Sequence, residues 1–442
     1  MEVSGGRARR GARMDRGGLA VGLRFPALLL IGLGQASCSS VADLTTSSIT
    51  PISTSAPAPR SIAEGPVQKP SSDFVAFTED VWQRAKAQGV SRRTFERAFA
   101  GVTPDPKVIA LTKKQSEFVK PIWDYLASAV SEQRLQRGTA AIADAAPTIT
   151  KVAQVYGVDR RAIVGVWGME TNFGSNMGNN DVIRALATLA YENYRGDYFR
   201  KELVTALRIL EEGHIDREHM IGSWAGAMGQ TQFMPSSFMS YAVDFTGDGR
   251  RDIWTSAPDA LASTANYLKK HGWQTGLPWG FEVKLPRGLT YGARMQPFAA
   301  WAAAGVRRMD GKAMPDAGEA RILMPAGARG PAFLVTKNFN VIKRYNNSDA
   351  YALGVALLGD RLYGGPPVQA PWPVEDRPLD RMQSVELQRH LQAHGFEVGE
   401  ADGKIGAQTR AAIASYQERA GLPADGYPSV TLLQHLRRST SG

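Results

Sequence analysis

The most informative segment of the chain reads Ile163-Val164-Gly165-Val166-Trp167-Gly168-Met169-Glu170-Thr171-Asn172-Phe173-Gly174. An apolar helical run ends here, because Asn172 and Gly174 favour a helix break. Glu170 therefore stands at a helix end, half surrounded by Trp167 and Phe173. Burial raises the pKa of a carboxyl group, so such a glutamate can stay protonated near neutral pH and act as a general acid. The alternative is an ordinary glutamate on the solvated face of a helix.

A second segment reads Gly222-Ser223-Trp224-Ala225-Gly226-Ala227-Met228-Gly229-Gln230-Thr231-Gln232-Phe233-Met234-Pro235-Ser236-Ser237-Phe238. Its small residues let the backbone approach another surface closely. Ser223, Gln230 and Gln232 offer hydrogen bonds, and the aromatic residues offer flat faces. This composition suits a sugar-binding cleft. The alternative is a tight helix–helix crossing, which small residues also permit.

Hydrophobic periodicity around these segments is mostly helical from Phe74 onward. It predicts helices over 114–136, 139–156, 160–171, 182–212, 258–270 and 338–362. Between about residues 276 and 336 the pattern alternates, as in Phe281-Glu282-Val283-Lys284-Leu285, which predicts a small β-containing insert.

These segments resemble the membrane-bound lytic murein transglycosylase B family. The resemblance runs in order from about residue 74 to 363 and includes Asp252-Ile253-Trp254, Ala265-Asn266-Tyr267-Leu268, Gly272-Trp273 and Arg344-Tyr345-Asn346-Asn347-Ser348. It implies a mainly α chain with a lysozyme-like helical catalytic domain. It also implies cleavage of the β-1,4 bond between N-acetylmuramic acid (MurNAc) and N-acetylglucosamine (GlcNAc) in peptidoglycan, with formation of a 1,6-anhydromuramyl end.

The resemblance also assigns roles to individual residues. Glu170 matches the catalytic glutamate, Ser223 and Gln232 match polar positions of the cleft, and Tyr345 matches a tyrosine near the catalytic carboxyl group. Asn346, beside Tyr345, is expected to bind substrate as well. Gln230 is included among the substrate-binding residues, although some family members carry an aromatic residue there.

A single carboxyl group fits this chemistry. Hydrolysing glycosidases usually place two carboxylates around the glycosidic bond. Asp181, which would have to supply the second carboxylate, is explained as the cap of a helix starting at Val182. With one acid, Glu170 would protonate the leaving oxygen and then deprotonate the C6 hydroxyl of the same sugar, with the 2-acetamido group stabilising the anomeric carbon. The alternatives are a hydrolytic muramidase and a non-catalytic peptidoglycan-binding or scaffold protein.

An acidic loop predicts a structural calcium ion, although the proposed reaction requires no cofactor. Oxygen ligands occur at positions 1, 3, 5, 7 and 9 of an EF-hand-like loop. Thr255 takes the position where a bidentate glutamate is expected, so the last ligand would come from farther along the chain. The candidate ligands are Asp244, Thr246, Asp248, the Arg250 carbonyl, Asp252 and Asp259. The alternative is an Asp-Gly turn stabilised by its own carboxylates.

The chain divides into segments of different composition. We expect an export signal over 1–38, a Ser/Thr/Pro/Ala-rich tether over 39–73, the catalytic domain over 74–363 and a Pro/Gly linker over 364–378. Residues 379–440 resemble the peptidoglycan-binding module common in cell-wall enzymes, with three short helices joined by Asp-Gly turns. A purely structural helical cap is the alternative for this module.

The N-terminus predicts export to the periplasm, because six arginines precede a short apolar run and then small residues. Cys38 stands where a bacterial lipoprotein carries its lipid, so lipidation and anchoring to the outer membrane are one interpretation. Ordinary cleavage, for example after Ala42, is the other.

Composition sets the remaining limits. A chain of 442 residues is too long for one ordinary hydrophobic core. One cysteine excludes a disulfide framework, and only six histidines argue against a His-built metal centre. The net charge of +10 favours a polyanionic partner. We expect glycan strands of peptidoglycan rather than nucleic acid, because no basic–aromatic patch accompanies the charge.

Overall fold

The computed structural model describes residues 71–113, 120–289 and 294–440. The expected export signal, most of the expected tether and Cys38 lie outside the described residues. The first described helix, α1, begins at Ser72, two residues earlier than the expected domain boundary. Ser71 causes this early start, because its hydroxyl accepts the amide hydrogen of Phe74 and caps the helix. Within the described ranges, no helix combines the length and apolarity that a membrane span requires.

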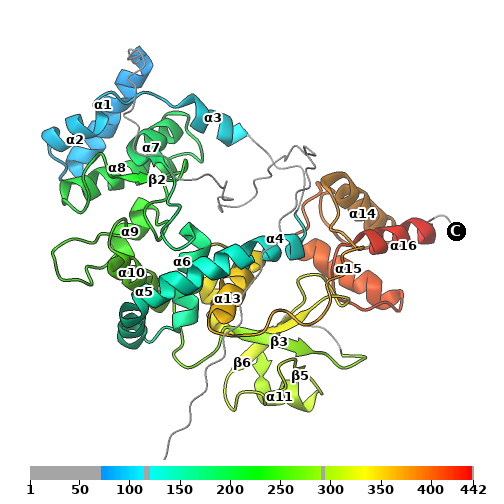
Figure 1. Ribbon diagram of the computed structural model, residues 1–442. Coiled ribbons are helices and arrows are strands. Elements are labelled where there is room, and N and C mark those ends of the chain that lie inside the picture. Colours follow the sequence, from blue (N-terminus) through cyan, green and yellow to red (C-terminus); the bar gives the residue numbers. More distant parts are fainter. Residues whose placement is uncertain (1–70, 114–119, 290–293, 441–442) are drawn as a thin grey trace, which may run out of the picture. The chain divides into compact units, whose positions relative to one another are not determined.

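Helices make up most of the described residues between 71 and 270 (Figure 1). They pack on one large apolar core, and the short strands β1 and β2 pair antiparallel between them. The elements are α1 (Ser72–Ala87), α2 (Arg92–Phe99), α3 (Pro106–Lys113), α4 (Ile122–Ala129), α5 (Glu132–Tyr156), α6 (Arg160–Thr171), β1 (Asn180–Asp181), α7 (Val182–Tyr191), α8 (Tyr198–Glu211), β2 (Ile221–Gly222), α9 (Pro235–Tyr241) and α10 (Ala257–Lys270).

Several helix boundaries differ from the sequence prediction. The helix expected over 182–212 is two helices, because Asn193, Arg195 and Gly196 adopt left-handed backbone conformations between α7 and α8. The break expected near residue 138 is absent, and α5 runs through Pro147 without interruption. The helix expected over 338–362 is α12 (Lys337–Ile342) and α13 (Asp349–Leu362), separated by a turn whose last residue, Ser348, caps α13.

The helices α6 and α13 cross closely at the centre of the catalytic domain. A Cβ atom on Gly165 would lie 2.2 Å from the carbonyl oxygen of Val355, and one on Gly359 would lie 2.2 Å from the carbonyl oxygen of Arg161. Only glycine permits this approach at either position. The crossing brings the end of α6 beside the start of α13.

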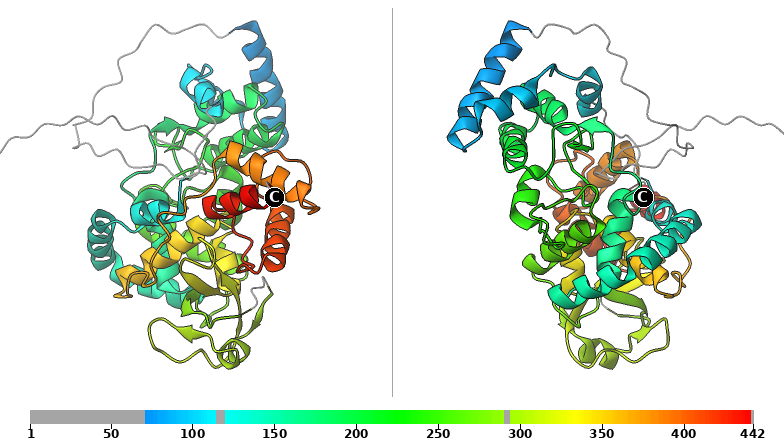
Figure 2. Two further views of the ribbon diagram at one scale, coloured as in Figure 1. Left: turned by 90° about the vertical axis from the view of Figure 1, so that its right-hand side faces the viewer. Right: turned by 60° about the vertical axis from the view of Figure 1, so that its left-hand side comes forward.

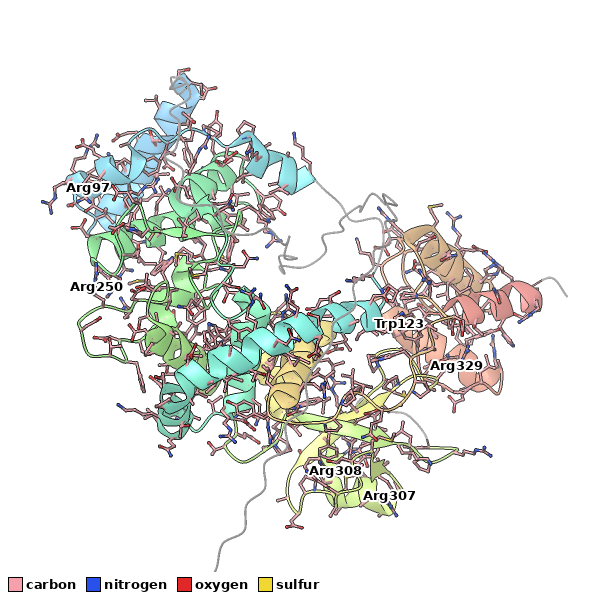
Figure 3. All side chains as sticks on the ribbon, viewed as in Figure 1. Arg97, Trp123, Arg250, Arg307, Arg308 and Arg329 are labelled. Carbon is pink, nitrogen blue, oxygen red and sulfur yellow. The ribbon has the colours of Figure 1, made fainter. Side chains whose placement is uncertain are left out.

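The region between α10 and α12 forms the expected β-containing insert. Its five strands pair antiparallel in the order β4-β6-β7-β3-β5, and Figure 2 shows this sheet from two further sides. Phe281, Phe298 and Trp301 belong to a small core of its own. Arg307 and Arg308 form β5, one of the two edge strands (Figure 3). The elements are β3 (Gly280–Lys284), β4 (Gln296–Pro297), α11 (Phe298–Ala303), β5 (Arg307–Arg308), β6 (Glu319–Leu323) and β7 (Ala332–Val335).

The C-terminal module contains α14 (Arg381–Ala393), α15 (Ala407–Arg419) and α16 (Val430–Thr440). Leu387, Ile413 and Leu433 are fully buried in a core that is separate from that of the catalytic domain. Asp380 and Gln383 form a capping box at the start of α14. These elements confirm the prediction of a mainly α chain with a β-containing insert and a three-helix C-terminal module.

Candidate active site

Glu170 lies in the last turn of α6, where the chain reverses. Asp159 caps the start of this helix by accepting the amide hydrogen of Arg161. At its end, Asn172, Phe173 and Gly174 all have positive φ angles of 50°, 63° and 78°. Three successive left-handed residues stop the helix sharply, so Glu170 is held at its terminus by a rigid backbone.

The Glu170 side chain is in a desolvated environment that favours its neutral form. Burial raises its pKa to about 7, and a hydrogen bond from Tyr351 partly opposes this rise. The Tyr351 hydroxyl donates to Oε1 of Glu170 at 2.5 Å from the first turn of α13. The pKa of Tyr351 itself is raised well above its usual value, first by burial and then by the charge of Glu170. Tyr351 therefore remains a proton donor throughout the physiological pH range.

Tyr351 was not identified from the sequence. It belongs to an apolar helical pattern and is 1% exposed, so periodicity places it in the core. The residue expected near the carboxyl group, Tyr345, donates instead to the hydroxyl of Thr264 at 3.3 Å. The charge of Glu170 nevertheless contributes to the raised pKa of Tyr345, after burial, so both tyrosines lie within electrostatic reach of the acid. Asn346 follows Tyr345 in the turn before α13 and is half-buried.

The second sequence segment folds against the end of α6. The indole nitrogen of Trp167 donates to Oε1 of Gln230 at 2.9 Å, and the Thr171 hydroxyl donates to the carbonyl oxygen of Gln230 at 3.1 Å. Gln230 therefore joins two segments that are about 60 positions apart in the sequence.

These contacts correct the expectation that Gln230 binds substrate. Its amide nitrogen donates to the carbonyl oxygen of Trp254 at 3.0 Å, so both ends of the side chain are engaged inside the protein. The residue is 7% exposed. Gln230 thus holds the end of α6 in place, and its buried side-chain amide is engaged by these internal contacts.

Ser223 and Gln232 shape the same loop. The Ser223 hydroxyl accepts the amide hydrogen of Ala227 at 3.0 Å. Gln232 has a φ angle of 50°, and its side-chain nitrogen donates to the carbonyl oxygens of Met177 and Gly229 at 3.1 and 3.0 Å. Gln232 is half-buried, and it ties this loop to the segment that follows Glu170.

Asp181 is occupied by structural contacts. Its carboxylate accepts the amide hydrogen of Arg184, which caps α7, and it pairs with Arg217 at 2.5 Å. The helix cap expected from the sequence is therefore present. A carboxylate held in this way is a poor candidate for the second acid of a hydrolase.

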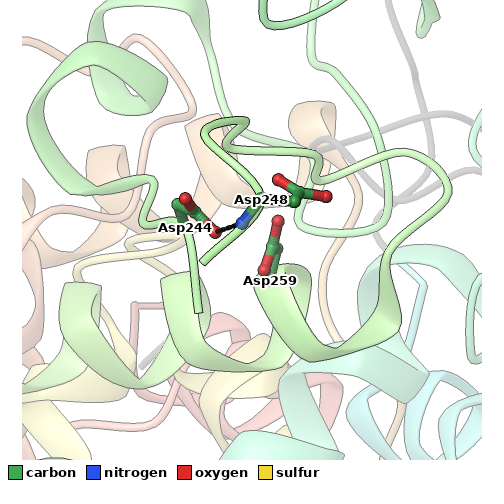
Figure 4. A group of neighbouring side chains, drawn as sticks. All are labelled: Asp244, Asp248 and Asp259. Atoms are coloured by element: carbon green, nitrogen blue, oxygen red, sulfur yellow. Dashed lines mark hydrogen bonds between the residues drawn. The ribbon is translucent and has the colours of Figure 1, made fainter. Parts of the chain in front are cut away.

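The acidic loop gathers three carboxylates close together (Figure 4). Asp244, Asp248 and Asp259 each place an oxygen within 4.8 Å of the others. Figure 4 shows the three side chains close together, with Asp259 on the helix beneath the loop that carries Asp244 and Asp248. Among the described residues, none of the three forms an ion pair with a lysine or arginine.

Asp259 enters this group from α10 and is fully buried. It accepts the amide hydrogens of Phe245, Thr246 and Asp252, so it fixes the two ends of the loop. Burial raises its pKa, and the charge of Asp244 adds to this effect.

The other expected ligands are arranged differently. Asp252 turns away to accept the amide hydrogens of Trp254 and Thr255 and the hydroxyl of Thr255. The Thr246 hydroxyl donates to Asp244 at 3.2 Å. Asp252 therefore caps the following turn and does not join the three grouped carboxylates.

Comparison with known families identifies both folded parts. Residues 73–360 match the model of the transglycosylase SLT domain, and residues 383–436 match that of a putative peptidoglycan binding domain. The chain is 38% identical over 229 residues to membrane-bound lytic murein transglycosylase B of Escherichia coli (strain K12). That match covers 48% of this chain and 59% of the relative, so the chain matches about three fifths of that protein's length.

Solved structures are similar over larger parts of the chain. The crystal structure of SltB3 from Pseudomonas aeruginosa in complex with NAG-anhNAM-pentapeptide is 50% identical, with a TM-score of 0.79, and covers 83% of this chain and 100% of that one. The Escherichia coli lytic transglycosylase Slt35 in complex with calcium is 31% identical, with a TM-score of 0.56, and covers 66% of this chain and 93% of that one. The similarity supports the lysozyme-like fold that the sequence predicted.

Proposed function

The chain belongs to the transglycosylase SLT domain family, and on this basis we propose that it is a lytic transglycosylase of peptidoglycan. It cleaves the β-1,4 bond between MurNAc and GlcNAc and leaves a 1,6-anhydromuramyl end. The observation that carries this proposal is the Glu170 carboxyl group, whose pKa is raised to about 7 by burial and which accepts a hydrogen bond from Tyr351. The name of the Escherichia coli relative supports the same activity.

Glu170 performs both proton transfers. In its neutral form it protonates the bridging oxygen as the bond breaks, and the resulting carboxylate then takes the proton of the C6 hydroxyl, which attacks the anomeric carbon. Because the nucleophile belongs to the substrate, its attack has the entropic advantage of a tethered reactant. The hydrogen bond from Tyr351 stabilises the carboxylate between these steps and orients it.

Mutation of Glu170 tests the proposal. Glu170→Gln keeps the shape of the side chain but removes the transferable proton, and we expect muropeptide release from sacculi to fall by at least about a hundredfold. Mass spectrometry of the wild-type products separates the two reaction types, because anhydro ends are lighter than hydrolysed ends by one water. Unchanged turnover in the variant would falsify the role of Glu170, and products with hydrolysed ends would identify a muramidase.

The C-terminal module supplies binding to the wall. Its match to a putative peptidoglycan binding domain supports glycan strands with their peptide stems as the partner of the whole chain. The pentapeptide in the SltB3 complex supports a substrate that carries such stems. Ser223, Gln232, Tyr345 and Asn346 are the proposed substrate-binding residues of the catalytic cleft.

A structural calcium ion is proposed at the acidic loop. Hard oxygen ligands suit calcium, and these three close carboxylates, which form no ion pair with a lysine or arginine of the described residues, make a group that a divalent ion would stabilise. Asp244, Asp248 and Asp259 would hold the ion, and the hydroxyl of Thr246 and the carbonyl oxygen of Arg250 remain candidates. The calcium complex of Slt35 supports this assignment.

The proposed place of action is the periplasm, since the substrate lies outside the cytoplasm. The N-terminal export signal supports this location, and lipidation of Cys38 would add an anchor in the outer membrane. The mass of the mature N-terminus distinguishes a lipidated Cys38 from cleavage after Ala42.

A further inference from the structure

A basic pocket lies between α2, the end of α8 and the residues that follow it. Its volume is about 190 Å³, and three arginines from separate parts of the chain line it, namely Arg97, Arg217 and Arg250. Arg97 belongs to α2, and Arg250 belongs to the acidic loop. Figure 3 shows both of them on the same side of the catalytic domain. The residues that line this pocket include none of the proposed catalytic or cleft residues.

One of these arginines is structural. Arg217 pairs with Asp181 at 2.5 Å and donates from Nε to the carbonyl oxygen of Ala98 at 2.9 Å. Its side chain is 18% exposed, so it forms part of the pocket wall.

The other two arginines have no acidic partner among the described residues. Arg97 and Arg250 are exposed, and within the described ranges neither pairs with an acidic side chain. Arg250 makes one long contact, from Nε to the carbonyl oxygen of Gly213 at 3.4 Å. The acid that lines the pocket, Asp216, is held by the ring nitrogen of His219 at 2.6 Å. The pocket therefore keeps an excess of positive charge.

The size and the chemistry of the pocket select a class of ligand. Pockets for whole drug-sized ligands have volumes of roughly 300–1,000 Å³, so this pocket accepts one group of a larger molecule. Guanidinium groups bind carboxylates through paired hydrogen bonds in one plane. Two such groups from different elements can approach a carboxylate from two directions.

We propose that this pocket binds a free carboxylate of the peptide stems carried by peptidoglycan strands. The inference rests on the proposed function, which supplies the substrate class. Peptide stems contain free carboxylates, whereas the neutral GlcNAc units of the strand offer none. The pocket would thereby distinguish strands with acidic stems from strands whose stems are amidated.

A binding experiment tests this proposal. The full chain with Glu170→Gln is titrated calorimetrically with a disaccharide pentapeptide whose stem carboxylates are free, and then with the same compound fully amidated. We expect the acid form to bind about tenfold more tightly, as for the loss of one charge-assisted hydrogen-bonded contact. Adding Arg97→Gln and Arg250→Gln together should make the two affinities equal. Arg93→Gln, an exposed arginine on the same helix outside the pocket, should preserve the difference.

Each outcome decides the proposal. The proposal is overturned if the Glu170→Gln protein binds the acid and amidated compounds with equal affinity. It is also overturned if the acid form still binds more tightly after Arg97 and Arg250 have been replaced. Displacement of the peptide by an equal concentration of inorganic phosphate would indicate a general anion site and would also overturn it. Affinity is measured without turnover, so the two proposals can fail separately. If the protein cleaves strands but binds acidic and amidated stems equally, only this inference is wrong. If it distinguishes the stems but produces no anhydro ends, only the proposed function is wrong.

Discussion

Glu170 and Tyr351 are 181 positions apart in the sequence, and their contact defines the chemistry of the site. The sequence identified the acid because its surroundings are local: an apolar helix precedes it and a helix break follows it. It did not identify the tyrosine, because the partner of a side chain depends on how two distant helices cross. The same reason explains Gln230, whose amide looks free in the sequence but is engaged by Trp167 and Trp254.

The Tyr351 hydrogen bond should be visible in the pH dependence of the reaction. The general acid must be protonated, so activity should fall as the pH rises through about 7. Tyr351→Phe removes a donor that favours the charged carboxylate, so the pKa of Glu170 should rise further. In assays of muropeptide release, we expect the falling limb of the pH–rate profile to move to higher pH by about one unit, and the maximal rate to be lower.

Tyr345→Phe is the matched control for this experiment. The Tyr345 hydroxyl contacts Thr264 rather than Glu170, so its removal should leave the position of the limb unchanged. A limb that moves to lower pH in Tyr351→Phe would contradict the assigned direction of the hydrogen bond.

At the scale of elements, the crossing of α6 and α13 sets the geometry of the site. Each helix was expected from periodicity, but their separation depends on Gly165 and Gly359, which the sequence shows only as glycines inside helices. The prediction of one helix over 338–362 was wrong for a related reason. The turn before α13 directs Tyr351 toward Glu170, and hydrophobic periodicity alone does not reveal such a turn.

Gly165→Ala should disturb both stability and activity. The added methyl group would lie 2.2 Å from the carbonyl oxygen of Val355, so the helices must separate. We expect a loss of about 1–3 kcal/mol in the free energy of unfolding, together with reduced turnover as Tyr351 moves away from Glu170.

Gly354→Ala provides the control on the same pair of helices. A Cβ atom there would first meet the terminal methyl of Met169 at 3.1 Å, and the flexible end of that side chain can move. Denaturant unfolding and activity assays of both variants give the comparison. Equal behaviour of the two variants would show that the close crossing is not required.

The acidic loop is the element whose proposed ion can be tested by stability. Asp244, Asp248 and Asp259 lie close together, so a divalent cation that binds them should stabilise the folded state, and calcium should raise the melting temperature of the full chain. At a concentration 100 times the dissociation constant, the gain would be about 2.7 kcal/mol. Asp259→Asn should abolish this response, because it removes the buried carboxylate of the group.

Asp144→Asn, an exposed acid on α5, is the control for the calcium titration. It should respond to calcium as the wild type does. Calorimetry gives the melting temperature in each case. If calcium does not change the melting temperature of the wild type, the proposed metal site is wrong.

At the scale of the whole molecule, the sequence indicated the modules through composition. The Pro/Gly-rich linker separated the last helices from the catalytic domain, and the alternating pattern between 276 and 336 located the insert. The arrangement of charges was harder to anticipate. Arg97, Arg217 and Arg250 are far apart in the sequence, and only the fold brings them to one pocket. A net positive charge therefore indicated an anionic partner without revealing where it binds.

The C-terminal module has a core separate from the large core of the catalytic domain, so we expect the two parts to unfold in separate steps. Polar contacts connect them, since the amide of Ala328 donates to Asp425 at 2.7 Å and the guanidinium of Arg329 donates to the hydroxyl of Thr431 at 3.3 Å. Such contacts couple two folded parts more weakly than a shared apolar core does. Leu387→Ala should therefore lower the midpoint of one transition, by a loss of about 2–5 kcal/mol, and leave the other nearly unchanged.

The same variant separates wall binding from catalysis. Leu387 is fully buried among the three helices of the module, whereas Met382 on the same helix is 76% exposed, so Met382→Ala should alter neither transition. Above the lowered midpoint we expect Leu387→Ala to sediment less with intact sacculi while it still cleaves short soluble glycan strands, because Glu170 and Tyr351 belong to the catalytic domain. Simultaneous loss of both activities would mean that the module supports the active site itself, and the two parts would then have to be treated as one cooperative unit.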